Sequence, residues 1–168
     1  SKADITIELN FASLDSGTLA QASPGSLHYL KTVGGVDYYE PAAIAELRTG
    51  VDPNGATADI VIDVNLNKLN AGEFFFSTTR GADLFGAPPL SKFDLFTVLT
   101  HEILHGLAFY STDFIGSDRS IFDFFVRDNG GSPYFDGPKA AAANGGFGFP
   151  LAIGDYSHWG GELYLSQA

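Results

Sequence analysis

The segment from Ser91 to Phe109 constrains the fold of this chain more than any other part of the sequence. Ser91 and Asp94 have the S-x-x-D spacing of a capping box, whose side chains satisfy N–H groups of a first helical turn. Leu90 and Leu95 stand at the two positions of a hydrophobic staple. Apolar residues then recur at helical spacing, at Phe93, Phe96, Leu99, Ile103 and Leu107. The pattern predicts one amphipathic helix that ends at about Phe109.

This predicted helix contains an H-E-x-x-H motif that starts at His101 and ends at His105. Histidines four residues apart lie on one helical face, so two imidazoles can bind the same metal ion. Neutral imidazole is a common ligand of Zn²⁺. Glu102 lies about 100° further round the helix, which places it to hydrogen-bond a metal-bound water rather than to bind the ion. The alternative is a helix with surface histidines and a solvated glutamate.

A catalytic zinc site needs a third protein ligand and an open coordination position. The compact H-E-x-x-H-x-x-G-x-x-H spacing would put Gly at 108 and His at 111, where this chain has Ala108 and Ser111. Two histidines remain. His158 lies in a polar, Gly-rich segment, whereas His28 has apolar neighbours and is expected to be structural. Carboxylates are the competing third ligands, at Glu162, Asp113, Asp118, Asp123 and Asp155.

The composition narrows the classes of function. The chain has 168 residues, no Cys, no Met and a formal net charge of −11. Without Cys there are no disulfides, thiolate metal ligands or cysteine nucleophiles. The acidic balance argues against a nucleic-acid partner and against an anionic membrane surface. No apolar run approaches the roughly 18–20 residues of a membrane span. Chemistry therefore depends on His, carboxylates, hydroxyls or a bound ion.

We expect a secreted protein that is a monomer and whose partner is a protein or peptide substrate. The chain begins at Ser1 with neither a signal peptide nor an initiator Met, which indicates a processed mature form or an excised domain. Asp52-Pro53-Asn54-Gly55 with Asp59, and the Asp/Gly turns after Tyr110, make structural Ca²⁺ a secondary expectation beside ordinary turn chemistry.

Hydropathy and turn residues predict the remaining elements. Strands are predicted at 4–11, 59–66 and 73–79, and short helices at 40–48 and 139–143. In the first of these helices Pro41 is expected at the first helical position. The stretches 12–35 and 144–168, and the loop 81–89, are expected to be irregular. The sequence thus predicts one α+β catalytic domain over 1–168, with an N-terminal α/β subdomain at about 1–110 and a loop-rich C-terminal subdomain at about 111–168.

The motif and its downstream context resemble a known family. His101-Glu102-Ile103-Leu104-His105-Gly106-Leu107-Ala108-Phe109 is followed some fifty residues later by Ser157-His158-Trp159 and then by Glu162-Leu163. This arrangement resembles the leishmanolysin-type zinc metallopeptidases, which are metzincins. The resemblance implies a zincin-like fold: a twisted mixed sheet, an active-site helix that carries H-E-x-x-H, and an irregular C-terminal lobe. It also implies His158 as the third metal ligand.

Two positions depart from the family pattern. Ala108 stands where the family usually has Gly, and Tyr164 stands where the methionine of the Met-turn would be. That methionine packs beneath the metal and does not bind it, so its replacement leaves the predicted zinc ligands in place. Tyr156 and Tyr164 flank the segment of the third ligand, where a phenol could stabilise an oxyanion or serve in packing.

The predicted function is that of a zinc-dependent endopeptidase. Zn²⁺ on His101, His105 and His158 would lower the pKa of a bound water, and Glu102 would take its proton and return it to the leaving amine. The substrate is expected to lie extended against an edge strand, at 59–66 or 73–79. Activity should fall in acid, because protonated imidazoles do not bind metal. The alternative is a non-enzymatic secreted module with a structural or vestigial zinc site and acidic loops that bind calcium or a partner.

Overall fold

The computed structural model describes residues 3–76, 89–112 and 118–160. The chain combines small sheets with a few helices, which confirms the α+β class. Its contacts group into two compact units, one of residues 1–27 and 41–107 and the other of residues 28–40 and 108–168. In the part of the chain that the structure describes, no helix has the length and apolarity that a membrane crossing requires.

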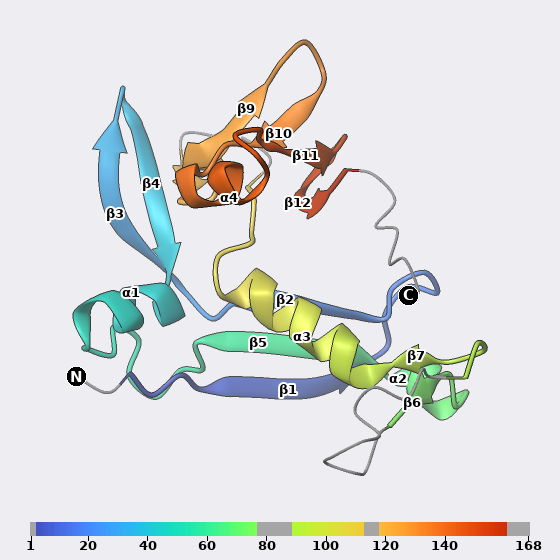
Figure 1. Cartoon of the computed structure of the whole chain (residues 1–168). Coiled ribbons are helices and arrows are strands. Elements are labelled where there is room, and N and C mark those ends of the chain that lie inside the picture. The colour runs from blue at the N-terminus through green and yellow to red at the C-terminus, as the bar shows by residue number, and fades with distance from the viewer. Residues whose placement is uncertain (1–2, 77–88, 113–117, 161–168) are drawn as a thin grey trace. The chain divides into compact units, whose positions relative to one another are not determined.

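The first unit contains a three-stranded sheet in the order β1-β5-β2. β1 (Ile7–Ala12) runs parallel to β5 (Ile60–Asn65), and β2 (Ala20–Pro24) runs antiparallel to it (Figure 1). The predicted strands at 4–11 and 59–66 are thus present. However, the expectation that 59–66 forms an edge strand is wrong, because β5 has a hydrogen-bonded neighbour on each side.

A smaller pair of strands precedes the longest helix of this unit. β6 (Phe74–Phe75) and β7 (Phe93–Asp94) pair in parallel, and Phe74 is buried in the core. The strand predicted at 73–79 is therefore confirmed only at its start, since residues 77–79 and nearly all of the loop predicted at 81–89 lie outside the described residues.

The described residues of the first unit include the helices α1 (Ala42–Thr49), α2 (Leu66–Asn70) and α3 (Leu95–Gly106). α1 confirms the helix predicted at 40–48, although Pro41 is its N-cap and not its first helical residue. Gly50 ends α1 in the left-handed conformation at φ 69°, and its N–H donates to the Glu46 carbonyl at 2.7 Å. That is the usual way in which a glycine terminates a helix.

The start of α3 differs from the predicted capping box. Asp94 is the N-cap itself, and its carboxylate accepts hydrogen bonds from the Thr97 N–H at 3.1 Å and from the Thr97 hydroxyl at 2.6 Å. Ser91 lies in a turn before the helix, and Leu90 is fully exposed, so neither the predicted box nor the predicted staple forms. The physical reason is that Asp94 is extended in β7, which moves the first helical residue to Leu95.

α3 packs on the sheet through only part of the predicted apolar set (Figure 1). Leu99, Ile103 and Leu107 pack against the core, as predicted. Phe93 lies before the helix in β7 and Phe96 is 67% exposed, so the prediction is wrong for these two residues. Ile60, Ile62 and Val64 of β5 are buried, and the residues of α3 and its C-cap that pack against their cluster are Leu95, Val98, Leu99, Ile103 and Leu107. Gly106 makes the closest approach, because a Cβ there would lie 2.3 Å from Cγ2 of Ile60. A glycine after the second histidine of the motif thus allows α3 to lie directly on β5.

The helix ends at Gly106 rather than at Phe109, and the backbone explains why. Ala108 has φ 113°, a conformation that L residues rarely adopt. A residue in this conformation carries backbone strain of about 1–3 kcal/mol. Ala108 is also the position at which leishmanolysin-type peptidases, which the motif resembles, usually have Gly.

Ala108→Gly is expected to raise the free energy of unfolding by about 1 kcal/mol, because relief of the strain exceeds the extra entropy of Gly in the unfolded chain. Urea denaturation of the full chain measures this change. The matched control is Ala45→Gly in the interior of α1, which should lower stability by about 1 kcal/mol or more. A loss of stability in Ala108→Gly as well would contradict a strained backbone at this position.

In its described residues, the second unit contains two small sheets. One has the order β3-β4-β8 and contains β3 (Leu27–Val33), β4 (Val36–Pro41) and β8 (Asp118–Ser120). The other has the order β12-β11-β10-β9 and contains β9 (Val126–Asp128), β10 (Pro133–Phe135), β11 (Phe149–Ala152) and β12 (Asp155–Trp159). A 3₁₀ helix, η2 (Asp123–Phe125), and a short helix, α4 (Pro138–Ala143), complete the unit, and α4 confirms the helix predicted at 139–143.

The expectation that 12–35 and the C-terminal residues are irregular is wrong. β2 and β3 lie within the first stretch, and β11 and β12 lie within the second. The strands of the C-terminal sheet have three to five residues, which is too short for an alternating pattern to stand out among Gly and Asp turns. The core of this unit is built from buried Phe122, Val126 and Leu151, with Phe135 and Tyr156 packed against them.

Candidate metal centre

The two histidines of the motif point at the same place. Both lie on α3, and their Nε2 atoms are 2.9 Å apart. Their rings have centroids 4.5 Å apart and are nearly perpendicular, at 85°. Two nitrogens on one tetrahedral zinc ion, each at 2.0–2.1 Å, would be about 3.3 Å apart. The pair therefore fits two ligands of one ion with only a small adjustment of the side chains.

Glu102 and the two histidines differ in exposure. His105 and Glu102 are buried, at 8% and 6% exposed, whereas His101 is exposed. One turn of helix thus has a buried imidazole, a more accessible imidazole and a buried carboxylate. A polar interaction of a carboxylate is stronger where bulk water is excluded.

In the second unit, His158 lies near the end of β12 and has a carboxylate partner. Its Nδ1 is 2.8 Å from Oδ2 of Asp155, and its side chain is 44% exposed. When a carboxylate accepts from Nδ1–H, the tautomer places the lone pair of the ring on Nε2. This pairing of carboxylate and histidine is typical of metal-binding histidines, whose second nitrogen is held by a partner.

The structure also shows which partners the competing carboxylate ligands have. Asp123 is 2% exposed, and both of its oxygens accept hydrogen bonds from protein groups. Asp155 is engaged with His158. Asp118 lies in β8, while Asp113 and Glu162 lie outside the described residues. The geometry makes Asp155 a partner of the histidine and Asp123 a structural acceptor.

Other residues singled out in the sequence have structural surroundings. His28 is half-buried in β3, and Tyr156 packs against the core of the second unit. Oδ1 of Asp52 accepts from the N–H groups of Asn54 at 2.9 Å and Gly55 at 2.7 Å, which is ordinary Asx-turn geometry. Asp59 accepts from the Thr6 backbone N–H at 2.8 Å. Tyr164 lies outside the described residues.

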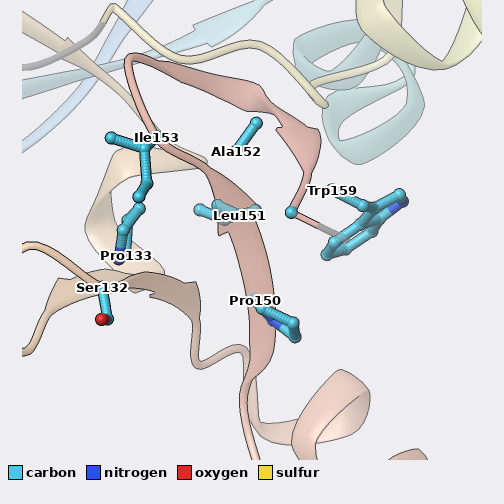
Figure 2. A pocket seen from close by; sticks show the side chains of 8 residues that line it. Ser132, Pro133, Pro150, Leu151, Ala152, Ile153 and Trp159 are labelled. Carbon is cyan, nitrogen blue, oxygen red and sulfur yellow. The ribbon is translucent and has the colours of Figure 1, made fainter. Parts of the chain in front are cut away.

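The described residues of the second unit line hollows that could receive a ligand side chain. One, of about 460 Å³, is lined by residues of β10, β11 and β12 and the residues next to them. Figure 2 shows its side chains around β11, with Trp159 on one side and with Ile153 and Pro133 on the other. The second hollow, of about 180 Å³, is lined by Ala108, Phe109, Ile121, Phe122, Phe125 and Phe135. Its wall is apolar and begins three residues after His105 in the chain.

Comparison with known proteins does not assign this chain to a family or give it a function. No known protein family, curated protein or solved structure matches the chain. The chemistry of the motif side chains and of His158 is therefore the basis for proposing a function.

Sequence reasoning missed two features of the candidate site. Asp155 was considered only as a ligand, although its position three residues before His158 could have indicated a partner. The second feature is a set of hydrogen bonds around Asp123 that extends to Ser157 through Ser111. These residues are far apart in the sequence, and no spacing pattern connects them.

Proposed function

We propose that the chain is a zinc-dependent endopeptidase. The observation that carries the proposal is the pair of Nε2 atoms of His101 and His105, 2.9 Å apart on one helix, with buried Glu102 between them in the sequence. In this proposal His158 supplies the third ligand through Nε2, because Asp155 holds its Nδ1. Three neutral imidazoles are a donor set that suits catalytic zinc and leaves one coordination position open.

The proposed mechanism gives Glu102 the work of moving a proton. When bound, zinc would polarise the scissile carbonyl and acidify a water molecule beside it. Glu102 accepts the proton of the attacking water and then delivers it to the nitrogen of the departing amine. Glu102 is 6% exposed and lies next to His101 in the motif.

The edge of β2 is the better candidate for binding the backbone of the substrate. Within the described residues, β2 is hydrogen-bonded to β5 alone, so its other edge is available to an extended peptide. Buried Ala20 of β2 belongs to the core cluster against which α3 packs, which places this strand beside the motif helix. We therefore propose strand addition to β2 in place of the predicted pairing with 59–66.

We propose that the hollow of about 180 Å³ lined by phenylalanines binds a side chain of the substrate. Its lining runs from Ala108 to Phe135, and all six lining residues are apolar. Ala108 follows His105 by only three residues in the chain. We propose a preference for a large apolar residue next to the scissile bond.

Metal analysis combined with peptide cleavage tests the proposed function. The purified chain should contain one zinc ion, cleave casein, lose that activity in a chelator and regain it when zinc is added back. A library of peptides that differ at one position next to the cleaved bond then tests the apolar preference. Cleavage that persists in excess chelator, or a chain that binds no zinc, would overturn the proposal.

A further inference from the structure

Asp123, in the second unit, is a buried carboxylate surrounded by neutral donors. It is 2% exposed. Oδ1 accepts from the Ser111 hydroxyl at 2.6 Å, and Oδ2 accepts from the Thr112 N–H at 3.1 Å, the Thr112 hydroxyl at 2.7 Å and the Ser120 N–H at 3.1 Å. Hydrogen bonds to a charged group are stronger than those between neutral groups. Asp123 therefore fixes residues 111 and 112 firmly to the start of η2.

The same hydrogen bonds extend to the strand of the proposed third ligand. The backbone N–H of Ser111 donates to Oγ of Ser157 at 3.0 Å, and Ser157 directly precedes His158 in β12. Ser111 is 5% exposed, and its contact with Ser157 is partly buried. Ser111 is also only six residues after His105. Within the second unit, Ser111 and the strand of His158 are thus held together.

We infer that Asp123 is a positioning residue for the third zinc ligand. Asp123 fixes Ser111, the Ser111 N–H binds Ser157, and Ser157 thereby fixes β12, which carries His158, relative to residues 111 and 112. This inference rests on the proposed function, because it matters only if His158 binds the metal. Asp123 itself touches neither the metal nor the substrate in this scheme.

Chemistry explains why a carboxylate is needed at this position. A carboxylate only accepts hydrogen bonds, and the groups that face Asp123 are two hydroxyls and two backbone N–H groups. An asparagine of the same shape would turn an NH₂ toward donors at one of the two oxygen positions. Asp123→Asn therefore weakens the hydrogen bonding that holds Ser111 without creating a cavity.

The test is zinc affinity of the full chain, measured at a temperature at which each variant is folded. Asp123→Asn should weaken zinc binding by up to about 10-fold, the lower end of the effect of losing a group that is hydrogen-bonded directly to a ligand, because Asp123 acts on His158 through Ser111 and Ser157. Its matched control is Asp59→Asn in the first unit. Asp59 is also 2% exposed and accepts from a threonine N–H at 2.8 Å and hydroxyl at 3.0 Å. Both variants should melt at lower temperature, but Asp59→Asn should keep wild-type zinc affinity.

Substitutions of Ser157 separate positioning from a general loss of stability. Ser157→Ala removes the acceptor of the Ser111 N–H and should also weaken zinc binding, whereas Ser157→Thr keeps a hydroxyl and should restore it. In Co²⁺-substituted protein, Ser157→Ala and Asp123→Asn should both change the visible spectrum, which reports the ligand geometry. Wild-type zinc affinity and an unchanged spectrum in both would overturn the inference while leaving the proposed function intact. A wild-type chain that binds no zinc would overturn both.

Discussion

Glu102→Gln is expected to lower kcat/KM for peptide hydrolysis by about 100- to 10,000-fold while the zinc content of the protein stays at the wild-type level. The amide of Gln keeps the size and the hydrogen-bonding reach of the carboxylate, but it cannot accept a proton at neutral pH. Because Glu102 is assigned no bond to the metal, the imidazoles of His101 and His105 remain available as ligands. The loss should therefore appear in catalysis and not in metal binding.

The control for this variant is a glutamate of the same unit that has no role in the proposed chemistry. Glu73 is partly exposed and pairs with Lys68 at 2.9 Å. Glu73→Gln should leave both zinc content and hydrolysis unchanged, because an exposed ion pair contributes little to stability. Wild-type turnover in Glu102→Gln would falsify the proposed mechanism. Loss of zinc in that variant would instead make Glu102 a ligand.

The helix that carries the motif was predictable because its signals are local. Of the predicted apolar positions from Phe93 to Leu107, Leu99, Ile103 and Leu107 pack against the core. Phe93 and Phe96 are exposed, and Leu95 and Val98 pack against the core in their place. The exact start of the helix was not predictable, since it depends on the pairing of Asp94 in β7 with β6, about twenty residues earlier in the chain. Both Ser91 and Asp94 are good N-caps by type, and only the tertiary pairing decides between them.

In the candidate site, too, the features set by local spacing were predictable and those set by tertiary contacts were not. Histidines four residues apart on a helix must share a face, so the pair of His101 and His105 follows from spacing alone. The contact of His158 with Asp155 and the hydrogen bonds of Asp123 form only when the second unit folds. Ser111 and Asp123 are twelve residues apart, and Ser111 and Ser157 are forty-six residues apart. No periodicity encodes those separations, which explains why Asp123 and Asp155 could be considered as ligands from the sequence.

His158→Ala is expected to weaken zinc binding by at least about 100-fold and to abolish hydrolysis in the same variant. Loss of a residue that merely orients a ligand already weakens binding by about 10- to 100-fold, so loss of the ligand itself should exceed that range. Asp155→Asn provides the graded comparison, because it keeps His158 but replaces the carboxylate that accepts from Nδ1. We expect zinc affinity to fall in the order wild type, Asp155→Asn, His158→Ala, as measured by competition with a chromophoric chelator.

The order of these affinities distinguishes the third ligand from its neighbours. If Asp155 were the ligand, Asp155→Asn would lose more affinity than His158→Ala, and the order would reverse. If a carboxylate such as Glu162 bound the metal, both variants would keep wild-type affinity and Glu162→Gln would lose it. His28→Ala is the matched histidine control, because His28 lies in β3 of the same unit and has no assigned part in zinc binding. Its zinc affinity should equal that of the wild type, so that a fall in His158→Ala reports a metal ligand and not the loss of any histidine from this unit.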